Sequence, residues 1–302
     1  MDRTKLLLPG LLMTVSLAMA QNADPSHAQV YTNAREALQA NPDATQLNLR
    51  DQQLFHLDDG LAQLKNLRFL NLMRNNMEEW DEDVFTLEKL EVLNVRSNKL
   101  KVLPSKIVSL DQLVRLDIAK NEIVHLPDEI GELRDLRYLH MSLNLLISVS
   151  KEVGRCKRLE VLELQNNQLS HLPSSIRKLR RLKKLNLGYN QFHEYDESWS
   201  ELRNLEELNL EFNYLRKLPK NIGDLKSLKT LVITHNHLES LPGEIAQLKN
   251  LEVLIISENN LQKLPQNLHK LKNLKTLIAV GNDFSEEEKN ALKMRSLSAK
   301  SI

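Results

Sequence analysis

A single thiol and nine histidines are the side chains of this 302-residue chain best suited to nucleophilic or metal-binding chemistry. Cys156 is the sole candidate for a thiol nucleophile, which reacts as the thiolate and therefore needs a lowered pKa. Corresponding positions of the chain, however, hold Leu133, Leu179, Leu202 and Leu225. A cysteine in an interior leucine position behaves as a small hydrophobic residue and keeps its proton. We therefore expect Cys156 to have a structural role.

The histidines lack the spacing of a metal site. The sequence contains no H-E-x-x-H motif, and His235 and His237 stand on either side of Asn236, so their side chains should point in different directions. Zinc needs ligands that converge in a tetrahedron. No Ser-His-Asp order or nucleotide motif occurs, and with eight glycines in the chain there is little room for a phosphate-binding loop. We expect no metal, no cofactor and no enzymatic activity.

The elements that would have to position any site are copies of one 23-residue pattern. Its clearest copy is LEELNLEFNYLRKLPKNIGDLKS at residues 205–227, and eleven copies follow one another without insertion or deletion. A fixed period of this length predicts a solenoid, in which each unit buries its apolar face by stacking on its neighbours. One polar column runs through all copies: Gln52, Asn75, Asn98, Asn121, Asn144, Asn167, Asn190, Asn213, Asn236, Asn259 and Asn282. Since a side-chain amide can satisfy backbone groups of a neighbouring coil, we interpret this column as a structural ladder.

The pattern L-x-x-L-x-L-x-x-N-x-L-x-x-L-P-x-x-I resembles the leucine-rich repeat, in the 23-residue form of Ras-suppressor-like proteins and of many bacterial surface or secreted proteins. The L-x-L core alternates at period two and predicts a short parallel strand with its leucines inward. The following segments predict short 3₁₀ or single α turns. The expected fold is an α/β leucine-rich repeat horseshoe over residues 44–284, with a parallel β-sheet on the concave face and helical turns on the convex face.

Both ends of the solenoid need caps, because terminal repeats would otherwise expose leucines. Residues 21–43 read as a polar leader and a helical cap, with helical spacing from Tyr31 to Ala40 and a stop at Asn41-Pro42. Residues 285–302 read as a second helical cap. Ser285 followed by Glu288 matches a capping box, which predicts a helix from about Glu286 to Met294.

The first twenty residues predict a secretory signal peptide. A basic start precedes an apolar run, which ends in Ala18-Met19-Ala20. The run is shorter than the ~20 residues of a comfortable membrane span, so we expect no membrane span after cleavage. A single cysteine and the absence of N-x-Ser/Thr sequons favour a bacterial periplasmic or secreted protein over an animal one. Removing residues 1–20 leaves 39 basic and 39 acidic residues, a balance that gives no support to a nucleic-acid partner.

Two copies of the repeat replace proline with aspartate and place aromatic residues at apolar positions. These copies contain Trp80 in one case, and Tyr195 and Trp199 in the other. One interpretation is a convex contact surface. The alternative, which we favour, is that large aromatic residues fill leucine positions in the core.

A charged column at the second position of the repeats alternates in sign. It reads Arg137, Glu160, Lys183, Glu206, Lys229, Glu252 and Lys275. With strands ~4.8 Å apart, each charge lies between two opposite ones. We assign this column to register and solubility, since exposed ion pairs contribute only ~0–1 kcal/mol each.

The concave face is where the copies differ, and variation on a uniform scaffold is where recognition is expected. Its first four repeats carry an excess of basic side chains, and repeats six to ten carry an excess of acidic ones. The predicted binding residues on this face are Arg115, Tyr138, His140, Leu143, Glu163, Tyr189, Glu207, Glu211, Phe212 and His235.

The centre of the predicted site is the eighth position of repeats five to nine. Leu143, Tyr189 and Phe212 stand there, with Asn166 and His235 completing the row. The row should span ~19 Å, enough for about six residues of extended peptide.

The sequence thus predicts a secreted or periplasmic module that binds a protein or peptide. Two alternatives remain open. Aromatic residues flanked by carboxylates and amides would also suit a glycan, as in an adhesive surface protein. An intracellular scaffold of the Ras-suppressor type would require that the first twenty residues do not export the chain.

Overall fold

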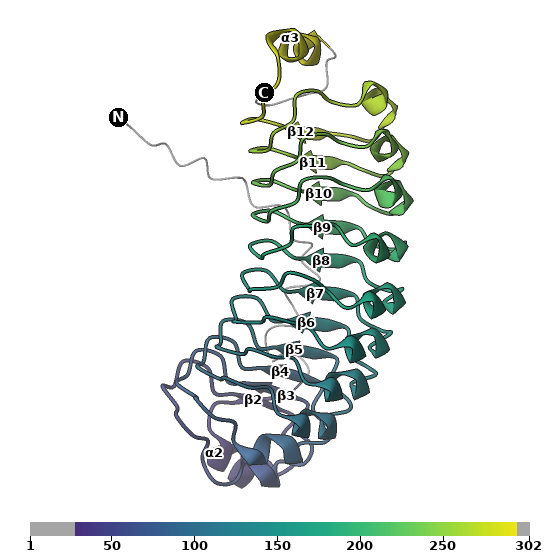
Figure 1. Cartoon of the computed structure of the whole chain (residues 1–302). Helices are drawn as coiled ribbons and strands as arrows, with labels where there is room; N and C mark the ends of the chain where they lie inside the picture. Colours follow the sequence, from purple (N-terminus) through teal and green to yellow (C-terminus); the bar gives the residue numbers. More distant parts are fainter. Residues whose placement is uncertain (1–27, 295–302) are drawn as a thin grey trace, which may run out of the picture.

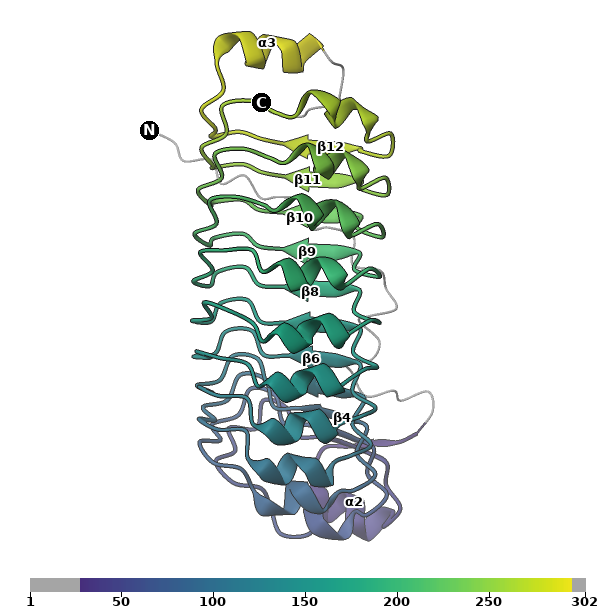
Figure 2. The ribbon, with the colours of Figure 1, turned by 45° about the vertical axis from the view of Figure 1, so that its right-hand side comes forward.

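The computed structural model describes residues 28–294, and within them the chain forms a single parallel sheet of twelve strands in the order of the sequence. Figures 1 and 2 show an elongated, curved solenoid with the strands on one side and short helices on the other. The strands are β1 (Val30–Tyr31), β2 (Gln46–Asn48), β3 (Phe69–Asn71), β4 (Val92–Asn94), β5 (Arg115–Asp117), β6 (Tyr138–His140), β7 (Val161–Glu163), β8 (Lys184–Asn186), β9 (Glu207–Asn209), β10 (Thr230–Val232), β11 (Val253–Ile255) and β12 (Thr276–Ile278).

The opposite side of the solenoid carries the predicted short turns, all of them 3₁₀ helices. They are η2 (Leu61–Gln63), η3 (Glu82–Thr86), η4 (Ser105–Ser109), η5 (Asp128–Glu132), η6 (Lys151–Arg155), η7 (Ser174–Lys178), η8 (Glu197–Glu201), η9 (Lys220–Asp224), η10 (Gly243–Gln247) and η11 (Gln266–Lys270). The ends carry two α-helices, α2 (Ala34–Ala40) and α3 (Glu286–Met294). The predicted leucine-rich repeat horseshoe is confirmed.

The strand register follows the period of the sequence. From β2 to β12 every residue pairs with the residue 23 positions away, as Leu208 pairs with Leu231. The central leucine of each of these strands points into the core, where Leu208 is 1% exposed and Leu231 is fully buried. Parallel strands therefore bring equivalent positions of all repeats into continuous columns.

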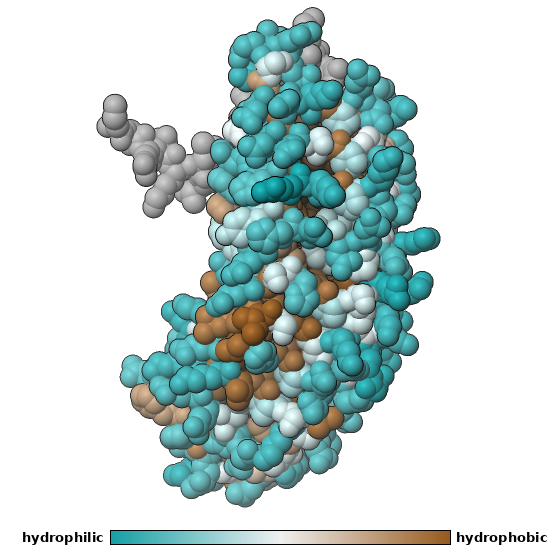
Figure 3. All heavy atoms as spheres, viewed as in Figure 1, coloured by the Kyte–Doolittle hydropathy of each residue, from teal (hydrophilic) through white to brown (hydrophobic). Residues whose placement is uncertain are grey.

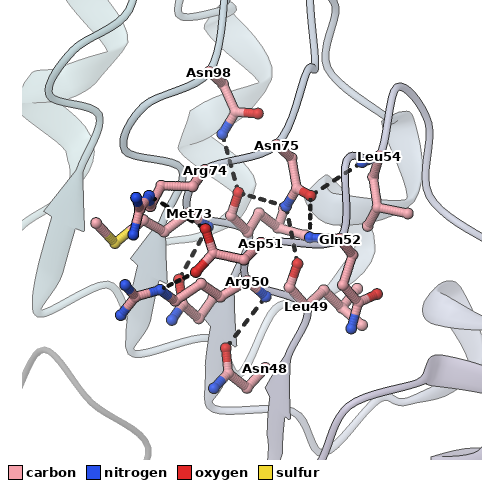
Figure 4. A network of polar contacts seen from close by, with 12 residues as sticks. Asn48, Leu49, Arg50, Asp51, Gln52, Leu54, Met73, Arg74, Asn75 and Asn98 are labelled. Atoms are coloured by element: carbon pink, nitrogen blue, oxygen red, sulfur yellow. Dashed lines mark hydrogen bonds and ion pairs between the residues drawn. The ribbon is translucent and has the colours of Figure 1, made fainter.

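The asparagine column forms the predicted ladder, and Figure 4 shows its first members. Asn75 Oδ1 accepts hydrogen bonds from the backbone N–H groups of Gln52 and Leu54, both at 3.1 Å. Its Nδ2 donates to the carbonyls of Leu49 and Leu72, both at 2.9 Å. One side chain thereby satisfies backbone groups in two repeats, and the pattern recurs along the column. Because these side-chain amides hydrogen-bond to backbone groups of the protein itself, the column is structural.

Proline precedes most of the 3₁₀ helices. Among the exceptions, η2 follows Gly60 without a side-chain cap, and η3, η6 and η8 replace proline with a capping side chain. Asp81 Oδ1 accepts from the N–H of Asp83 at 3.0 Å, and Asp196 Oδ1 accepts from the N–H of Ser198 at 2.8 Å. Ser150 caps η6 in the same way. The Asp-for-Pro exchanges seen in the sequence are therefore one way of starting the same helix.

The N-terminal cap differs from the expectation. The predicted helix over residues 31–40 begins only at Ala34, with Asn33 Oδ1 capping the N–H of Glu36 at 2.9 Å. Val30 and Tyr31 instead form β1, which pairs with β2 and adds a twelfth strand. The pairing buries Tyr31 and covers the edge that the first repeat would otherwise expose.

The C-terminal helix α3 has the predicted bounds, with one difference in its capping. Ser285 Oγ accepts from the N–H of Glu288 at 3.2 Å. The Glu288 carboxylate accepts from the backbone N–H of Leu264 at 3.2 Å, where a full capping box would use the N–H of Ser285. Glu288 thus connects the cap to the preceding repeat. The predicted signal peptide and the end of the predicted C-terminal cap, residues 295–302, lie outside the described residues.

Candidate functional site

The eighth position of each repeat has an unusual backbone conformation. All ten non-glycine residues there have φ between 50° and 59°, and Gly281 completes the column at 69°. The left-handed region costs an ordinary L-residue roughly 1–2 kcal/mol, and glycine or asparagine is preferred there. Leu143, Tyr189, Phe212 and His235 nevertheless occupy it with their side chains exposed. These bulky residues are unfavourable in the left-handed turn. Their presence therefore favours a functional role over a contribution to stability.

Three of these side chains form a stacked ladder. The ring centroids of Tyr189 and Phe212 lie 4.2 Å apart at 16°, and those of Phe212 and His235 lie 4.1 Å apart at 25°. A second ladder runs beside it, where Tyr214 stacks between His193 at 5.0 Å and His237 at 6.0 Å. The structure thus brings together three of the predicted site residues, Tyr189, Phe212 and His235.

An open groove of about 810 Å³ runs between the eighth and tenth columns of the C-terminal repeats. The asparagine ladder from Asn167 to Asn259 forms its floor, and Tyr189, Phe212 and Glu258 line one wall. The tenth column lines the other wall with Gln191, Tyr214, His237, Asn260 and Asp283. We name this space the C-terminal groove. The predicted site did not include the tenth column. Its position directly after the asparagine column could have indicated that it lies beside the eighth column.

Two predicted acidic residues, Glu207 and Glu211, lie on the concave face beside the ladder. Glu207 is exposed, whereas Glu211 is half-buried and accepts a hydrogen bond from Asn209 Nδ2 at 2.9 Å. Glu211 leans over Gly188, where an added Cβ would lie 2.9 Å from its Cγ. The absence of a side chain at Gly188 therefore makes the space that this carboxylate occupies.

Arg115, Tyr138, His140 and Glu163 form a separate polar chain across β5, β6 and β7. Arg115 Nη1 lies 2.8 Å from His140 Nε2, and His140 Nδ1 lies 2.8 Å from Glu163 Oε2. Lys184 on β8 closes the chain at 2.8 Å from Glu163 Oε1. Arg115 also stacks 4.2 Å above the ring of Tyr138.

Arg115 and His140, both predicted as binding residues of the concave face, are buried. Arg115 is 2% exposed and His140 is 5% exposed. Burial lowers the pKa of Arg115, against the raising effect of Tyr138 and nearby carboxylates. Burial alone would raise the pKa of Glu163, but the hydrogen bonds and charges of His140 and Lys184 outweigh it and lower that pKa to about 2. This chain binds four strands together and offers little surface.

Leu143 belongs to a third group, in the loop that follows β6. Leu143, Leu145 and Ile147 are 44%, 43% and 46% exposed. Figure 3 shows that apolar residues gather in one area over the loops of the middle repeats, with hydrophilic residues around it. Asn166 separates Leu143 from Tyr189 in the eighth column, so the predicted row is divided into an apolar part and an aromatic part.

The fifth column contains a second structural set of polar residues. Asn71, Asn94, Asp117 and Asn209 each accept, through Oδ1, a hydrogen bond from the backbone N–H two residues ahead, at 2.8 to 3.1 Å. This local turn leads the chain from the strand towards the left-handed residue. In the sequence, the signal for this turn is an Asn three positions before the eighth-column residue.

The remaining chemical candidates are structural. Cys156 is fully buried, its Sγ donates to the carbonyl of Ile130 at 3.1 Å, and burial raises its pKa to about 12. Trp199 is fully buried against Phe192 and Tyr195, and Trp80 Nε1 donates to the carbonyl of Val102 at 2.7 Å. The core interpretation is thus confirmed for Trp199.

The described part of the chain holds neither a metal-binding cluster nor a membrane-spanning helix. Across residues 28–294, no three His, Cys, Asp or Glu side chains lie close enough to hold a metal ion together. No helix within the same span combines the length and the apolar character needed to cross a membrane.

Comparisons with known proteins identify the repeats. A family model described as "Leucine-rich repeat region" matches residues 46–136 and 199–300, and one described as "Leucine rich repeat" matches residues 157–215. No curated protein matches the chain.

Many solved structures are similar to this chain, including bacterial and plant proteins. A leucine-rich repeat protein of Leptospira interrogans is 39% identical with a TM-score of 0.84, over 91% of this chain and 69% of that one. The plant peptide hormone receptor RGFR1 in complex with RGF2 is 25% identical with a TM-score of 0.71, over 79% of this chain and 40% of that one. An internalin of Listeria monocytogenes shares the fold. It is 18% identical with a TM-score of 0.73, over 86% of this chain and 74% of that one.

Proposed function

The chain belongs to the leucine-rich repeat family, and from that premise we propose that it is an exported, non-catalytic module that binds a peptide or protein segment on its concave side. The observation that carries this proposal is the contiguity of exposed aromatic side chains in repeats seven and eight. Tyr189, Phe212 and Tyr214 are 42%, 38% and 44% exposed and belong to two adjoining stacks. Contiguous apolar patches of this kind mark interfaces more often than isolated exposed residues do.

Two further observations support the proposal. The plant receptor that is 25% identical to this chain was solved with RGF2 bound, which supports a peptide as the kind of partner. The 39% identity with the Leptospira interrogans protein supports a bacterial origin, in agreement with the exported bacterial protein that the sequence predicts. The balanced charge of the chain favours a protein partner over nucleic acid.

Selection of a displayed random-peptide library on the immobilised full-length chain tests the binding proposal. We expect convergent peptide families whose binding protects backbone amides of the loops after β8, β9 and β10 from hydrogen exchange, with η7 to η9 unchanged. A library that yields no convergent sequences, together with specific signals on a glycan array, would instead support the adhesive alternative.

Intact-mass measurement of the protein from its native host tests export. Cleavage after Ala20 gives a mature chain that starts at Gln21. A cytosolic species that retains Met1 would contradict the export proposal and favour an intracellular scaffold.

A further inference from the structure

The stacked arrangement of the aromatic residues limits what the C-terminal groove can bind. Phe212 has Tyr189 on one side at 4.2 Å and His235 on the other at 4.1 Å, so both faces of its ring are covered. Tyr214 is likewise flanked by His193 and His237. A sugar stacks flat on a ring face, whereas these rings offer mainly their edges. Ring edges pack well against the apolar or aromatic side chain of a peptide.

The far end of the same groove is acidic and unneutralised. Glu258 and Asp283 line it in repeats ten and eleven, and neither carboxylate makes an ion pair or side-chain hydrogen bond among the described residues. The Glu258 carboxylate lies over Gly281, where an added Cβ would come within 2.4 Å of it. Because residue 281 is a glycine, the Glu258 carboxylate can occupy the end of the groove. In contrast, Glu163 on β7 and Glu206, which directly precedes β9, are paired with lysines.

The spacing of the two ends follows from the strand spacing. Phe212 and Glu258 are two repeats apart, and Tyr214 and Asp283 are three repeats apart. At ~4.8 Å per strand these separations are ~10 Å and ~14 Å, which an extended peptide covers in about three to four residues.

We infer that the C-terminal groove holds an extended peptide that has an aromatic or apolar side chain against Phe212 and Tyr214 and a positive charge, about three to four residues away, at Glu258 and Asp283. The peptide runs along the solenoid axis, over the asparagine ladder. This inference rests on the proposed function and specifies the partner's chemistry and the part of the concave side that it occupies.

Fluorescence anisotropy with short labelled Gly/Ser peptides tests the inference on the full-length chain. Each peptide carries one Phe and one Arg, in either order and with increasing separation, and a matched series carries Glu in place of Arg. We expect the tightest binding in one of the two orders at a separation of about three to four residues. The Glu series should bind at least about tenfold more weakly, because it places like charges together.

Two substitutions locate the site. Phe212→Asn should weaken binding by about 30-fold or more, as loss of a central aromatic anchor does. Asparagine suits the left-handed conformation at φ 50°, so this variant should keep the wild-type melting temperature or exceed it. Glu258→Gln should weaken the Arg peptides about fivefold and reduce the salt dependence of their association. Phe55→Asn and Glu197→Gln, exposed positions outside the groove, are the matched controls and should leave affinity within about twofold.

The outcomes separate this inference from the proposed function. Peptides that bind wild type and Phe212→Asn equally would place the site elsewhere and overturn the inference, while peptide binding itself stands. Equal affinity for the Arg and Glu series would overturn the charge assignment. If the chain binds a glycan and Phe212→Asn abolishes that binding, the occupant of the groove is a sugar, and the inference of a peptide is overturned. If the designed peptides fail to bind, the inference falls, and the display selection alone decides the proposed function.

Discussion

Asn167 shows how one amide side chain joins neighbouring repeats. Its Oδ1 accepts from the N–H of Leu146 at 3.0 Å, and its Nδ2 donates to the carbonyls of Met141 and Leu164 at 3.0 and 2.9 Å. Removing the amide would leave the buried N–H of Leu146 without this acceptor, whereas the carbonyls of Met141 and Leu164 would keep the amides of Asn144 and Asn190. A buried unpaired polar group costs ~1–3 kcal/mol.

Asn167→Ala should therefore lower the free energy of unfolding by ~1–3 kcal/mol. Equilibrium urea denaturation measures the difference. The adjacent Gln168 is exposed, and Gln168→Ala is the control, with an expected change within ~0.5 kcal/mol. Equal effects of the two substitutions would contradict the structural role of the ladder.

Glu163 makes part of the stability dependent on pH. Its folded pKa of about 2 lies below the ordinary value of 4.5, so the ionised form stabilises the fold. That contribution is complete above pH 4.5 and is lost as the pH falls through the folded pKa. Glu163→Gln should cost about 2–3 kcal/mol at pH 7 and almost nothing near pH 2.

Chemical denaturation of wild type and Glu163→Gln across this pH range measures the effect. Glu207→Gln, on an exposed carboxylate of β9, is the control and should show a small difference at every pH. A constant difference between Glu163→Gln and wild type from pH 7 to pH 2 would refute the paired carboxylate.

Cys156 should be almost unreactive in the folded protein. Because burial raises its pKa from 9.0 to about 12, its thiolate fraction near neutral pH falls by about three orders of magnitude. Labelling with a thiol reagent should be at least ~100-fold slower in buffer than in denaturant. Rapid stoichiometric labelling of the native protein would contradict the structural assignment.

At the scale of elements, the alternating charges form ion pairs between neighbouring repeats. Glu160 lies 3.6 Å from Arg137 and 2.8 Å from Lys183, and Glu206 lies 2.6 Å from Lys229. Apart from Glu160, the side chains of these pairs are exposed, so solvent and salt screen them. They support the register that the leucines already impose.

Glu206→Gln should change the free energy of unfolding by less than ~1 kcal/mol, and the change should shrink in high salt. Urea denaturation at low and high ionic strength measures it. Peptide affinity should stay unchanged, because Glu206 lies outside the C-terminal groove. If Glu206→Gln lowered the free energy of unfolding by several kcal/mol, the charged column would be a major determinant of stability, contrary to this prediction.

At the scale of the whole molecule, the strict period makes each repeat replaceable by its neighbour. The register is 23 residues at every pair from β2 to β12. Deleting residues 90–112 removes one complete unit and should leave a folded solenoid, whose denaturant m-value falls by about one tenth. Affinity at the C-terminal groove should persist, since the deleted unit is distant from it.

A deletion of residues 90–101 is the control, because it removes about half of a unit. It places polar residues in leucine columns and should abolish cooperative unfolding. Far-ultraviolet circular dichroism and urea titration distinguish the two chains. Similar behaviour of both would show that the period does not govern stability.

The sequence by itself determined the columns of this protein. A 23-residue period and inward leucines specify which residues are neighbours in adjacent repeats, so the sheet, the asparagine ladder, the 3₁₀ turns, the helix at Glu286–Met294 and the burial of Cys156 followed from pattern alone. The same period placed Tyr189, Phe212 and His235 in one row.

Only the tertiary structure decided which members of a column reach the surface. Arg115 and Tyr189 both occupy outward positions, yet Arg115 is 2% exposed and Tyr189 is 42% exposed. The difference arises from neighbours in other repeats, since Tyr138 and His140 enclose Arg115. The left-handed eighth column, the pairing of β1 and the covered faces of Phe212 likewise depend on backbone angles and cross-repeat contacts. A period in sequence states which residues meet, and the physical packing of unequal side chains decides what remains exposed.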